Sequence, residues 1–282
     1  MTTPTAQGAR TLADLTGTIV LVGAGKMGSA MLDAWLALGL SPKRVIAIEP
    51  QPTSELTALA TRGLTLNPSM TAVRDVAAIV LAIKPQVAAT AVPTLAPLLA
   101  PDTVVLSIMA GRTLGFLAGA LTQHTALVRA MPNTPAAIGR GITVAVPNAQ
   151  VSQRQRALVH ALLAATGMVE WVSDEALMDA VTAVSGSGPA YVFLLAEALS
   201  SAGAAAGLPP ELAAKLARAT VSGAGELLNH SALDPATLRQ NVTSPGGTTA
   251  AALDVLMAGD GMTELMNRAV IAATRRSREL AG

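Results

Sequence analysis

The first part of the chain, up to Ser173, alternates between short apolar runs and longer stretches of helical periodicity. The runs at 18–22, 77–83 and 104–108 are rich in Val, Ile and Leu, as in strands that are buried on both faces. Further strands are predicted at 44–48, 64–66, 126–130, 142–146 and 168–172, and helices at 26–38, 55–62 and 152–165. Strands that alternate with helices predict a mainly parallel α/β sheet with right-handed connections.

Beyond Val172 only helical patterns remain. Helices are predicted at 174–183, 190–206, 210–229, 235–241, 248–257 and 262–280. Prolines stand at or near several of these starts, because a missing N–H costs little in the first turn of a helix. We therefore predict three parts: a loosely ordered extension at 1–16, an α/β domain at 17–173 and an all-α domain at 174–282.

Composition narrows the class of protein. Hydrophobic residues are 51% of the 282 residues but aromatic residues only 2%, so small aliphatic side chains carry the packing. The net charge of +1 argues against a nucleic-acid partner. The chain has no cysteine, which excludes disulfides and cysteine-based metal sites, and we predict no metal site of any kind.

Neither a signal peptide nor a membrane span is predicted. Residues 1–15 are polar and lack an apolar core of signal-peptide length. The uncharged stretch at 85–101 contains internal prolines, and the one at 180–196 is interrupted by a Ser-Gly-Ser-Gly-Pro sequence. We therefore expect a cytoplasmic protein without a membrane partner.

A glycine-rich turn follows the first predicted strand and opens the first predicted helix. In that context the pattern Gly-x-Gly-x-x-Gly permits a tight turn, the approach of a pyrophosphate and close helix packing. The turn predicts a Rossmann-type domain whose cofactor contacts are Gly23, Ala24, Gly25, Lys26, Met27 and Gly28. The alternative is a glycine-rich βα turn without a ligand.

Glu49 ends the second predicted strand, about 20 residues after the glycine-rich turn. A carboxylate there accepts hydrogen bonds from an adenosine ribose and repels a 2′-phosphate, which favours NADH over NADPH. Residues 50–54 could still form a phosphate-binding turn, and a solvated acid at a strand end is the other interpretation of Glu49.

Two further motifs directly follow strands, Ala82-Ile83-Lys84-Pro85 and Met131-Pro132-Asn133-Thr134-Pro135. Both are expected at the carboxyl edge of the sheet, where open α/β folds bind ligands. Lys84 is either a contact to cofactor or substrate or a solvated loop lysine.

Late in the chain, residues 241–249 read Asn-Val-Thr-Ser-Pro-Gly-Gly-Thr-Thr and precede a predicted helix. Two glycines let the backbone approach a ligand, and two threonines place hydroxyls at a helix N-terminus. Free N–H groups and the helix dipole favour a carboxylate there. A nucleotide site early in the chain and a small-anion site late in it predict a two-domain reductase.

Five motifs together resemble the pyrroline-5-carboxylate reductase family, in its order and at its spacing from about Thr18 to Leu280. They are Gly23-Ala24-Gly25-Lys26-Met27-Gly28, Ala82-Ile83-Lys84-Pro85-Gln86, Arg129-Ala130-Met131-Pro132-Asn133-Thr134-Pro135, Ser185-Gly186-Ser187-Gly188-Pro189-Ala190-Tyr191 and Ser244-Pro245-Gly246-Gly247-Thr248-Thr249. The last of these is the most specific.

The resemblance implies the reduction of 1-pyrroline-5-carboxylate to L-proline with NADH or NADPH, the last step of proline synthesis. It implies that the nicotinamide lies near Ala82, Ile83, Lys84 and Pro85 and near Asn133-Thr134. The substrate carboxylate would meet Ser244, Gly246, Gly247 and Thr248, with Asn241 nearby. Thr249 would hydrogen-bond the ring nitrogen and is the predicted catalytic residue.

The resemblance further implies that the helical domain forms a homodimer and that dimers assemble into larger rings. Glu49 departs from the small or phosphate-binding residue that relatives more often carry, which puts NADPH preference in doubt.

The reaction is chemically consistent with these residues. A cyclic imine takes its proton from water, so hydride transfer to the C=N bond demands orientation rather than a strong general acid. His124, His160 and His230 lie outside every motif and are expected to do no chemistry. Residues 185–188 are either a floor to the substrate pocket or a packing turn.

Two other functions stay open on the sequence. One is a 3-hydroxyacid dehydrogenase, although the segment after the second Gly-rich turn, 189–194, lacks the lysine that such enzymes use. The other is a non-catalytic NAD-sensing protein, against which the intact loops of both domains count.

Overall fold

The computed structural model describes residues 12–121 and 125–281. The chain divides into two compact units, Met1–Gly186 with Arg275–Gly282, and Ser187–Thr274. The predicted boundary at Ser173 falls inside the first unit, and the assignment of domains stays a prediction. Residues 1–11 of the predicted extension lie outside the described residues, whereas Leu12 is buried and its N–H donates to the Leu38 carbonyl at 2.8 Å.

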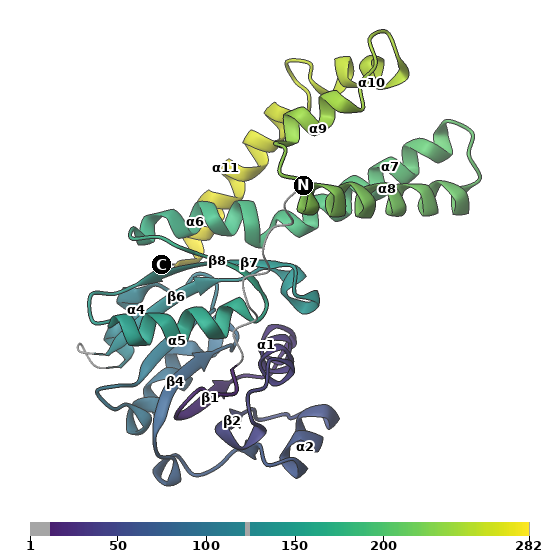
Figure 1. Cartoon of the computed structure of the whole chain (residues 1–282). Helices are drawn as coiled ribbons and strands as arrows, with labels where there is room; N and C mark the ends of the chain where they lie inside the picture. The colour runs from purple at the N-terminus through teal and green to yellow at the C-terminus, as the bar shows by residue number, and fades with distance from the viewer. Residues whose placement is uncertain (1–11, 122–124, 282) are drawn as a thin grey trace. The chain divides into compact units, whose positions relative to one another are not determined.

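The first unit is built on an eight-stranded sheet (Figure 1). Its strands are β1 Thr18–Val22, β2 Val45–Ile48, β3 Thr65–Leu66, β4 Val76–Leu81, β5 Val104–Ser107, β6 Ala126–Met131, β7 Gly141–Pro147 and β8 Gly167–Trp171. They lie in the order β3-β2-β1-β4-β5-β6-β7-β8, and every neighbouring pair is parallel except β6 and β7. The predicted parallel-dominated Rossmann-type sheet is therefore confirmed.

Helices and short turns of the first unit cover both faces of this sheet. They are α1 Lys26–Ala37, η1 Pro42–Arg44, α2 Ser54–Thr61, η2 Met70–Ala72, η3 Pro85–Val87, α3 Ala88–Ala91, η4 Val92–Leu98, α4 Leu114–Ala120, η5 Thr134–Ile138, α5 Gln153–Ala164, η6 Glu175–Leu177, α6 Met178–Val181 and the π-helical turn η7 Thr182–Gly186. One apolar core joins α1 and α5 to the sheet, and a second joins α3, η4 and α4. Trp35 of α1 is fully buried and donates its Nε1–H to the Leu162 carbonyl at 2.8 Å.

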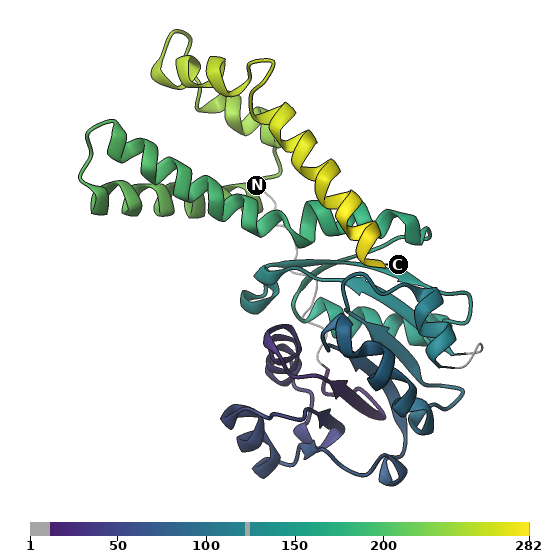
Figure 2. The same ribbon diagram turned by 180° about the vertical axis from the view of Figure 1, so that it is seen from behind.

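The second unit is helical, as predicted. Its helices are α7 Gly188–Ala205, α8 Pro210–His230, α9 Pro235–Asn241, α10 Thr248–Leu256 and most of α11 Met262–Ala281. The views in Figures 1 and 2 show α7 and α8 side by side as a hairpin. The hairpin turns at Gly207, whose φ of +101° favours glycine. None of the helices in the described ranges is long and apolar enough to cross a membrane.

Three details of the secondary structure differ from the prediction. The single helix expected at 174–183 is wrong, because η6, α6 and the π-helical turn η7 divide that segment. Helix α4 was not predicted, since Gly115 and Gly119 lower its helix propensity, although Thr113 caps it by accepting the Phe116 N–H. The antiparallel pairing of β6 with β7 was not predicted, because a period-2 pattern does not encode strand direction.

Candidate active site

The glycine-rich turn lies at the carboxyl end of β1, where each glycine meets a separate requirement. Gly23 has φ +90°, in the left-handed region that favours glycine. A Cβ on Gly28 would collide with the carbonyl oxygen of Gly23. At Gly25, in contrast, no atom lies within 4 Å of the position of a Cβ, so a ligand has room against the backbone.

The first turn of α1 follows this turn and presents backbone donors. Gly25 is the N-cap and provides no side-chain hydrogen bond, so the N–H groups of Lys26 and Met27 have no capping acceptor. Lys26 is exposed. Because a helix N-terminus with free N–H groups attracts anions, this turn fits the pyrophosphate of a dinucleotide.

Glu49 contacts the glycine-rich turn directly. Its Oε2 accepts the backbone N–H of Ala24 at 2.8 Å, and its Oε1 accepts the N–H of Gln51 at 3.0 Å. The Asn67 side chain fixes the Glu49 backbone, since Oδ1 accepts the Glu49 N–H at 2.8 Å and Nδ2 donates to its carbonyl at 2.9 Å. The carboxylate is therefore anchored beside the predicted cofactor turn.

The motif Ala82-Ile83-Lys84-Pro85 lies beside the same turn, because β4 pairs with β1 and Val22 lies opposite Leu81. The N–H of Ala82 donates to the Val22 carbonyl at 2.8 Å, and a Cβ on Gly23 would come within 2.7 Å of the Ala82 carbonyl. Lys84 is exposed and its ammonium makes no hydrogen bond or ion pair within the described ranges.

Asn133 lies two residues beyond the end of β6, a strand that is two positions away from β4 on the sheet. Its Oδ1 accepts the Ile142 N–H at 3.0 Å, which fixes the orientation of the carboxamide. The next segment, η5, packs against α1, so the motif approaches the helix that begins at the glycine-rich turn. The structure thus gathers the predicted cofactor residues at one edge of the sheet.

Arg129 of the same motif makes a buried ion pair that sequence reasoning did not predict. Its guanidinium donates to Glu175 Oε1 at 2.8 Å, and the Arg129 side chain is only 5% exposed. The same carboxylate oxygen accepts the Leu114 N–H at the start of α4. Arg129 therefore has a structural role: it links β6 to η6 through Glu175 rather than presenting its charge to a ligand.

The Ser-Gly-Ser-Gly motif forms the end of η7 and the start of α7. Gly186 packs on Met131 at the end of β6, where a Cβ would come within 2.5 Å of the Met131 Cε. Close packing therefore accounts for this glycine. The Ser185 hydroxyl is shielded from solvent and has no hydrogen-bond partner in the described residues. A role of the motif as a pocket floor stays a prediction.

The predicted substrate residues belong to the second unit, in the turn between α9 and α10. The turn closes through a hydrogen bond from the Gly247 N–H to the Ser244 carbonyl at 3.0 Å, and Gly246 has φ +66°. Gly247 is the N-cap of α10 and provides no side-chain acceptor, so the N–H groups of Thr248 and Thr249 have no capping partner.

The Thr243 hydroxyl of this segment donates to the Arg239 carbonyl at 2.7 Å, whereas four other polar side chains have no such partner within the described ranges. Among the described residues, no hydrogen bond is made by the side chains of Asn241, Ser244, Thr248 or Thr249. Backbone donors and unpaired hydroxyls at a helix N-terminus are what a carboxylate ligand requires.

Among the residues that the structure describes, the histidines and acidic residues form no alternative catalytic or metal-binding site. His160 Nδ1 accepts the Trp171 Nε1–H at 3.3 Å, and His230 pairs with Glu226 on the surface of α8. His124 lies outside the described residues. No group of His, Asp and Glu residues that could hold a metal ion is found in the described ranges.

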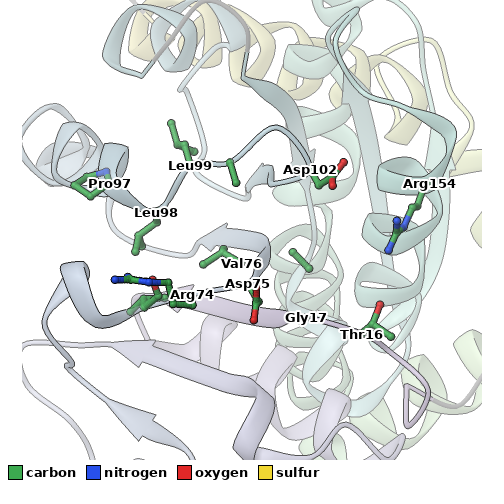
Figure 3. A pocket seen from close by; sticks show the side chains of 13 residues that line it. Thr16, Gly17, Arg74, Asp75, Val76, Pro97, Leu98, Leu99, Asp102 and Arg154 are labelled. Carbon is green, nitrogen blue, oxygen red and sulfur yellow. The ribbon is translucent and has the colours of Figure 1, made fainter.

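A cavity of about 590 Å³ lies at the opposite, amino edge of the sheet (Figure 3). Its lining includes Gly17 and Asp75, which precede β1 and β4, and Asp102 before β5. Figure 3 shows Arg74 and Arg154 on opposite sides of this cavity. None of the predicted cofactor or substrate residues lines it, so we assign it no role in the reaction.

Comparison with known proteins gives two family matches. Residues 18–111 match NADP oxidoreductase, coenzyme F420-dependent, and residues 175–280 match pyrroline-5-carboxylate reductase dimerisation. The first covers the glycine-rich turn and the Lys84 motif, and the second covers the turn at the start of α10.

Curated relatives and solved structures agree over nearly the whole length. Pyrroline-5-carboxylate reductase of Pseudomonas aeruginosa is 39% identical over 93% of this chain and 96% of its own, and that of Pisum sativum is 38% identical over the same shares. The solved pyrroline-5-carboxylate reductase of Coxiella burnetii is 33% identical, with a TM-score of 0.87 over 95% of this chain and 99% of its own. That of Plasmodium falciparum, solved with NADP bound, is 28% identical, with a TM-score of 0.80 over the same shares. This chain therefore belongs to the pyrroline-5-carboxylate reductase family.

Proposed function

We propose that this protein reduces 1-pyrroline-5-carboxylate to L-proline, with the cofactor bound at the Gly23–Gly28 turn and the substrate carboxylate at the start of α10. The oxidoreductase class and the nicotinamide cofactor follow from membership of the family. The observation that carries the assignment of the substrate site is the start of α10. There the N–H groups of Thr248 and Thr249 have no capping side chain, and the hydroxyls of Ser244, Thr248 and Thr249 have no hydrogen-bond partner among the described residues.

The protein's own groups bind the substrate and orient it, and none of them needs to act as a strong general acid. The bound cofactor supplies the hydride. Backbone N–H groups of Thr248 and Thr249, with the Ser244 hydroxyl, hold the carboxylate by charge-assisted hydrogen bonds. The Thr249 hydroxyl hydrogen-bonds the ring nitrogen, whose charge is lost as the C=N bond is reduced. Holding both reactants in one orientation lowers the barrier to hydride transfer.

NADH is the preferred cofactor in this proposal. Glu49 presents an anchored carboxylate next to the glycine-rich turn, where it would accept the ribose hydroxyls and repel a 2′-phosphate. Residues 49–61 contain no Lys or Arg to bind such a phosphate. A second acid, Glu55 in the first turn of α2, adds a further negative charge, and its own backbone N–H and the Thr53 and Ser54 hydroxyls lower its pKa.

The protein is a homo-oligomer, and we propose that the helical unit forms the dimer and that dimers assemble further. In the second unit, Ala213 and Ala217 are the only buried hydrophobic residues. Exposed apolar side chains cover its helices instead, among them Phe193, Leu194, Leu216 and Ile271. A surface that apolar indicates a protein partner. The expected location is the cytoplasm.

The test is turnover of 1-pyrroline-5-carboxylate with NADH and with NADPH, followed by the loss of reduced nicotinamide and the formation of L-proline. We expect one proline for each nicotinamide oxidised and a higher kcat/KM with NADH. Turnover of a 3-hydroxyacid instead, or cofactor binding without turnover of either substrate, would contradict the proposal.

A further inference from the structure

Arg112 makes a contact with the nicotinamide-facing motif that no sequence pattern predicted. It lies in the loop between β5 and α4, and its Nε and Nη2 donate to the Pro85 carbonyl at 3.1 and 2.9 Å. Two N–H groups of one guanidinium therefore converge on a single oxygen. The guanidinium also stacks on the Phe116 ring, with Cζ 4.7 Å from the ring centroid.

The Pro85 carbonyl, which accepts the Arg112 hydrogen bonds, also takes part in the backbone hydrogen bonds of the turn after β4. The Pro85 carbonyl also accepts the Ala88 N–H, and the Lys84 carbonyl accepts the Val87 N–H at 3.1 Å. These bonds define the path of the backbone from Ala82 into α3. The charged Arg112 guanidinium is an additional donor on this carbonyl and restricts how far the Pro85–Gln86 peptide can tilt, because charge-assisted hydrogen bonds are stronger than neutral ones.

The loop that carries Arg112 packs against the C-terminal end of α11. Gly111 has φ +69°, and a Cβ there would come within 3.2 Å of the Leu280 carbonyl in the last turns of α11. That end of α11 is fixed in the same unit by the Ser277 hydroxyl, which donates to Asp179 Oδ1 at 2.7 Å. The backbone of the loop is therefore held by packing, which limits the movement of the Arg112 side chain.

We propose that Arg112 is a positioning residue for the cofactor: it fixes the Lys84–Pro85 turn in the orientation that receives the nicotinamide. The inference rests on the proposed function, since it takes this turn as the nicotinamide-facing one. Arg112 acts through the Pro85 carbonyl and needs no contact with the reacting atoms. Misplacement of a turn beside the reacting carbon lowers the rate of hydride transfer while leaving the carboxylate site of the second unit unchanged.

The matched variants are Arg112→Met and Arg156→Met. Arg156 also stacks on an aromatic ring, with Cζ 4.6 Å from the Trp171 centroid, and makes no hydrogen bond to the turn after β4 within the described residues. Both substitutions remove a stacked guanidinium and keep an apolar side chain, so differences between them report the Pro85 contact. Arg112→Lys keeps one donor within reach of that carbonyl and is the conservative variant.

The first readout is amide hydrogen exchange of the peptide 83–92 in the cofactor-free protein. Arg112→Met should exchange faster there than the parent or Arg156→Met, with the thermal midpoints of the two variants alike. The second readout is kinetic: Arg112→Met should lose about ten-fold in kcat/KM for NADH. The KM for 1-pyrroline-5-carboxylate should stay the same, and Arg112→Lys should recover part of the loss.

Unchanged exchange of the peptide 83–92 in Arg112→Met overturns the inference, as does an equal kinetic loss in Arg156→Met. Failure of the proposed function looks different. In that case the parent protein itself does not turn over 1-pyrroline-5-carboxylate, while exchange and the NADH dissociation constant, measured by nicotinamide fluorescence, still report whether Arg112 organises the turn.

Discussion

The carboxylate of Glu49 accepts the backbone N–H of Ala24 at 2.8 Å, so the end of β2 is tied to the glycine-rich turn before any cofactor arrives. The second carboxylate oxygen accepts the Gln51 N–H, and Asn67 holds the Glu49 backbone from both sides. Glu49 is thus fixed in position at the place where the adenosine ribose is expected.

Glu49→Ser should weaken NADH binding and relieve repulsion of NADPH, because the carboxylate that accepts the ribose hydroxyls and repels a 2′-phosphate is gone. The measurement is the ratio of kcat/KM for the two cofactors. Glu55→Ser is the control, since Glu55 lies six residues later in the first turn of α2 and, within the described residues, makes no hydrogen bond to the glycine-rich turn. An unchanged ratio in Glu49→Ser would show that Glu49 does not select the cofactor.

Thr249→Val keeps the shape of the side chain and removes the hydroxyl that is proposed to bond the ring nitrogen. Loss of that hydrogen bond should cost about 2–4 kcal/mol of transition-state stabilisation. NADH affinity should barely change. Thr263→Val removes a hydroxyl at the same second position of another helix, α11, and should be neutral. If Thr249→Val turns over the substrate at the native rate, Thr249 has no role in catalysis and is only a residue in the first turn of α10.

Glu175→Gln should destabilise the first unit by about 2–4 kcal/mol, because the nearly buried Arg129 guanidinium loses its counter-charge. The amide oxygen can still accept the Leu114 N–H, so the loss reports the ion pair more than the helix start. Urea unfolding measures it, with the exposed Glu170→Gln as control. Equal midpoints for the two variants would contradict a structural role for the pair.

Leu194→Glu should impair assembly, because Leu194 is 62% exposed on α7 of a unit with almost no buried apolar side chain. Sedimentation at micromolar concentration should show at least a dimer for the parent and a smaller species for the variant. Ser201→Glu, a charge at an exposed position of the same helix, tests whether charge alone is responsible. A monomeric and active parent protein would contradict dimerisation through this unit.

Hydrophobic periodicity was sufficient to predict the sheet, because a buried parallel strand leaves an apolar run between turn residues. The run at 18–22 matches β1 Thr18–Val22 to the residue. It was also sufficient to predict α7 to α11 within a few residues, since each begins near a proline or after a glycine-containing turn.

Features that depend on distant backbone atoms could not be predicted. Arg112 is one charged residue in a loop, and its partner is a carbonyl 27 positions earlier. Glu175 gives no signal of its pairing with Arg129, because that contact arises only when η6 returns to the end of β6. The orientation of β7 against β6 depends on the connection through η5, which local patterning does not encode.

The central claim is hydride transfer from the nicotinamide to the imine carbon of 1-pyrroline-5-carboxylate, and NADH deuterated at the transferred position tests it most directly. The account predicts L-proline with one deuterium, on the δ-carbon, formed in step with the oxidised cofactor. Proline without deuterium, or oxidised cofactor without labelled proline, would contradict it.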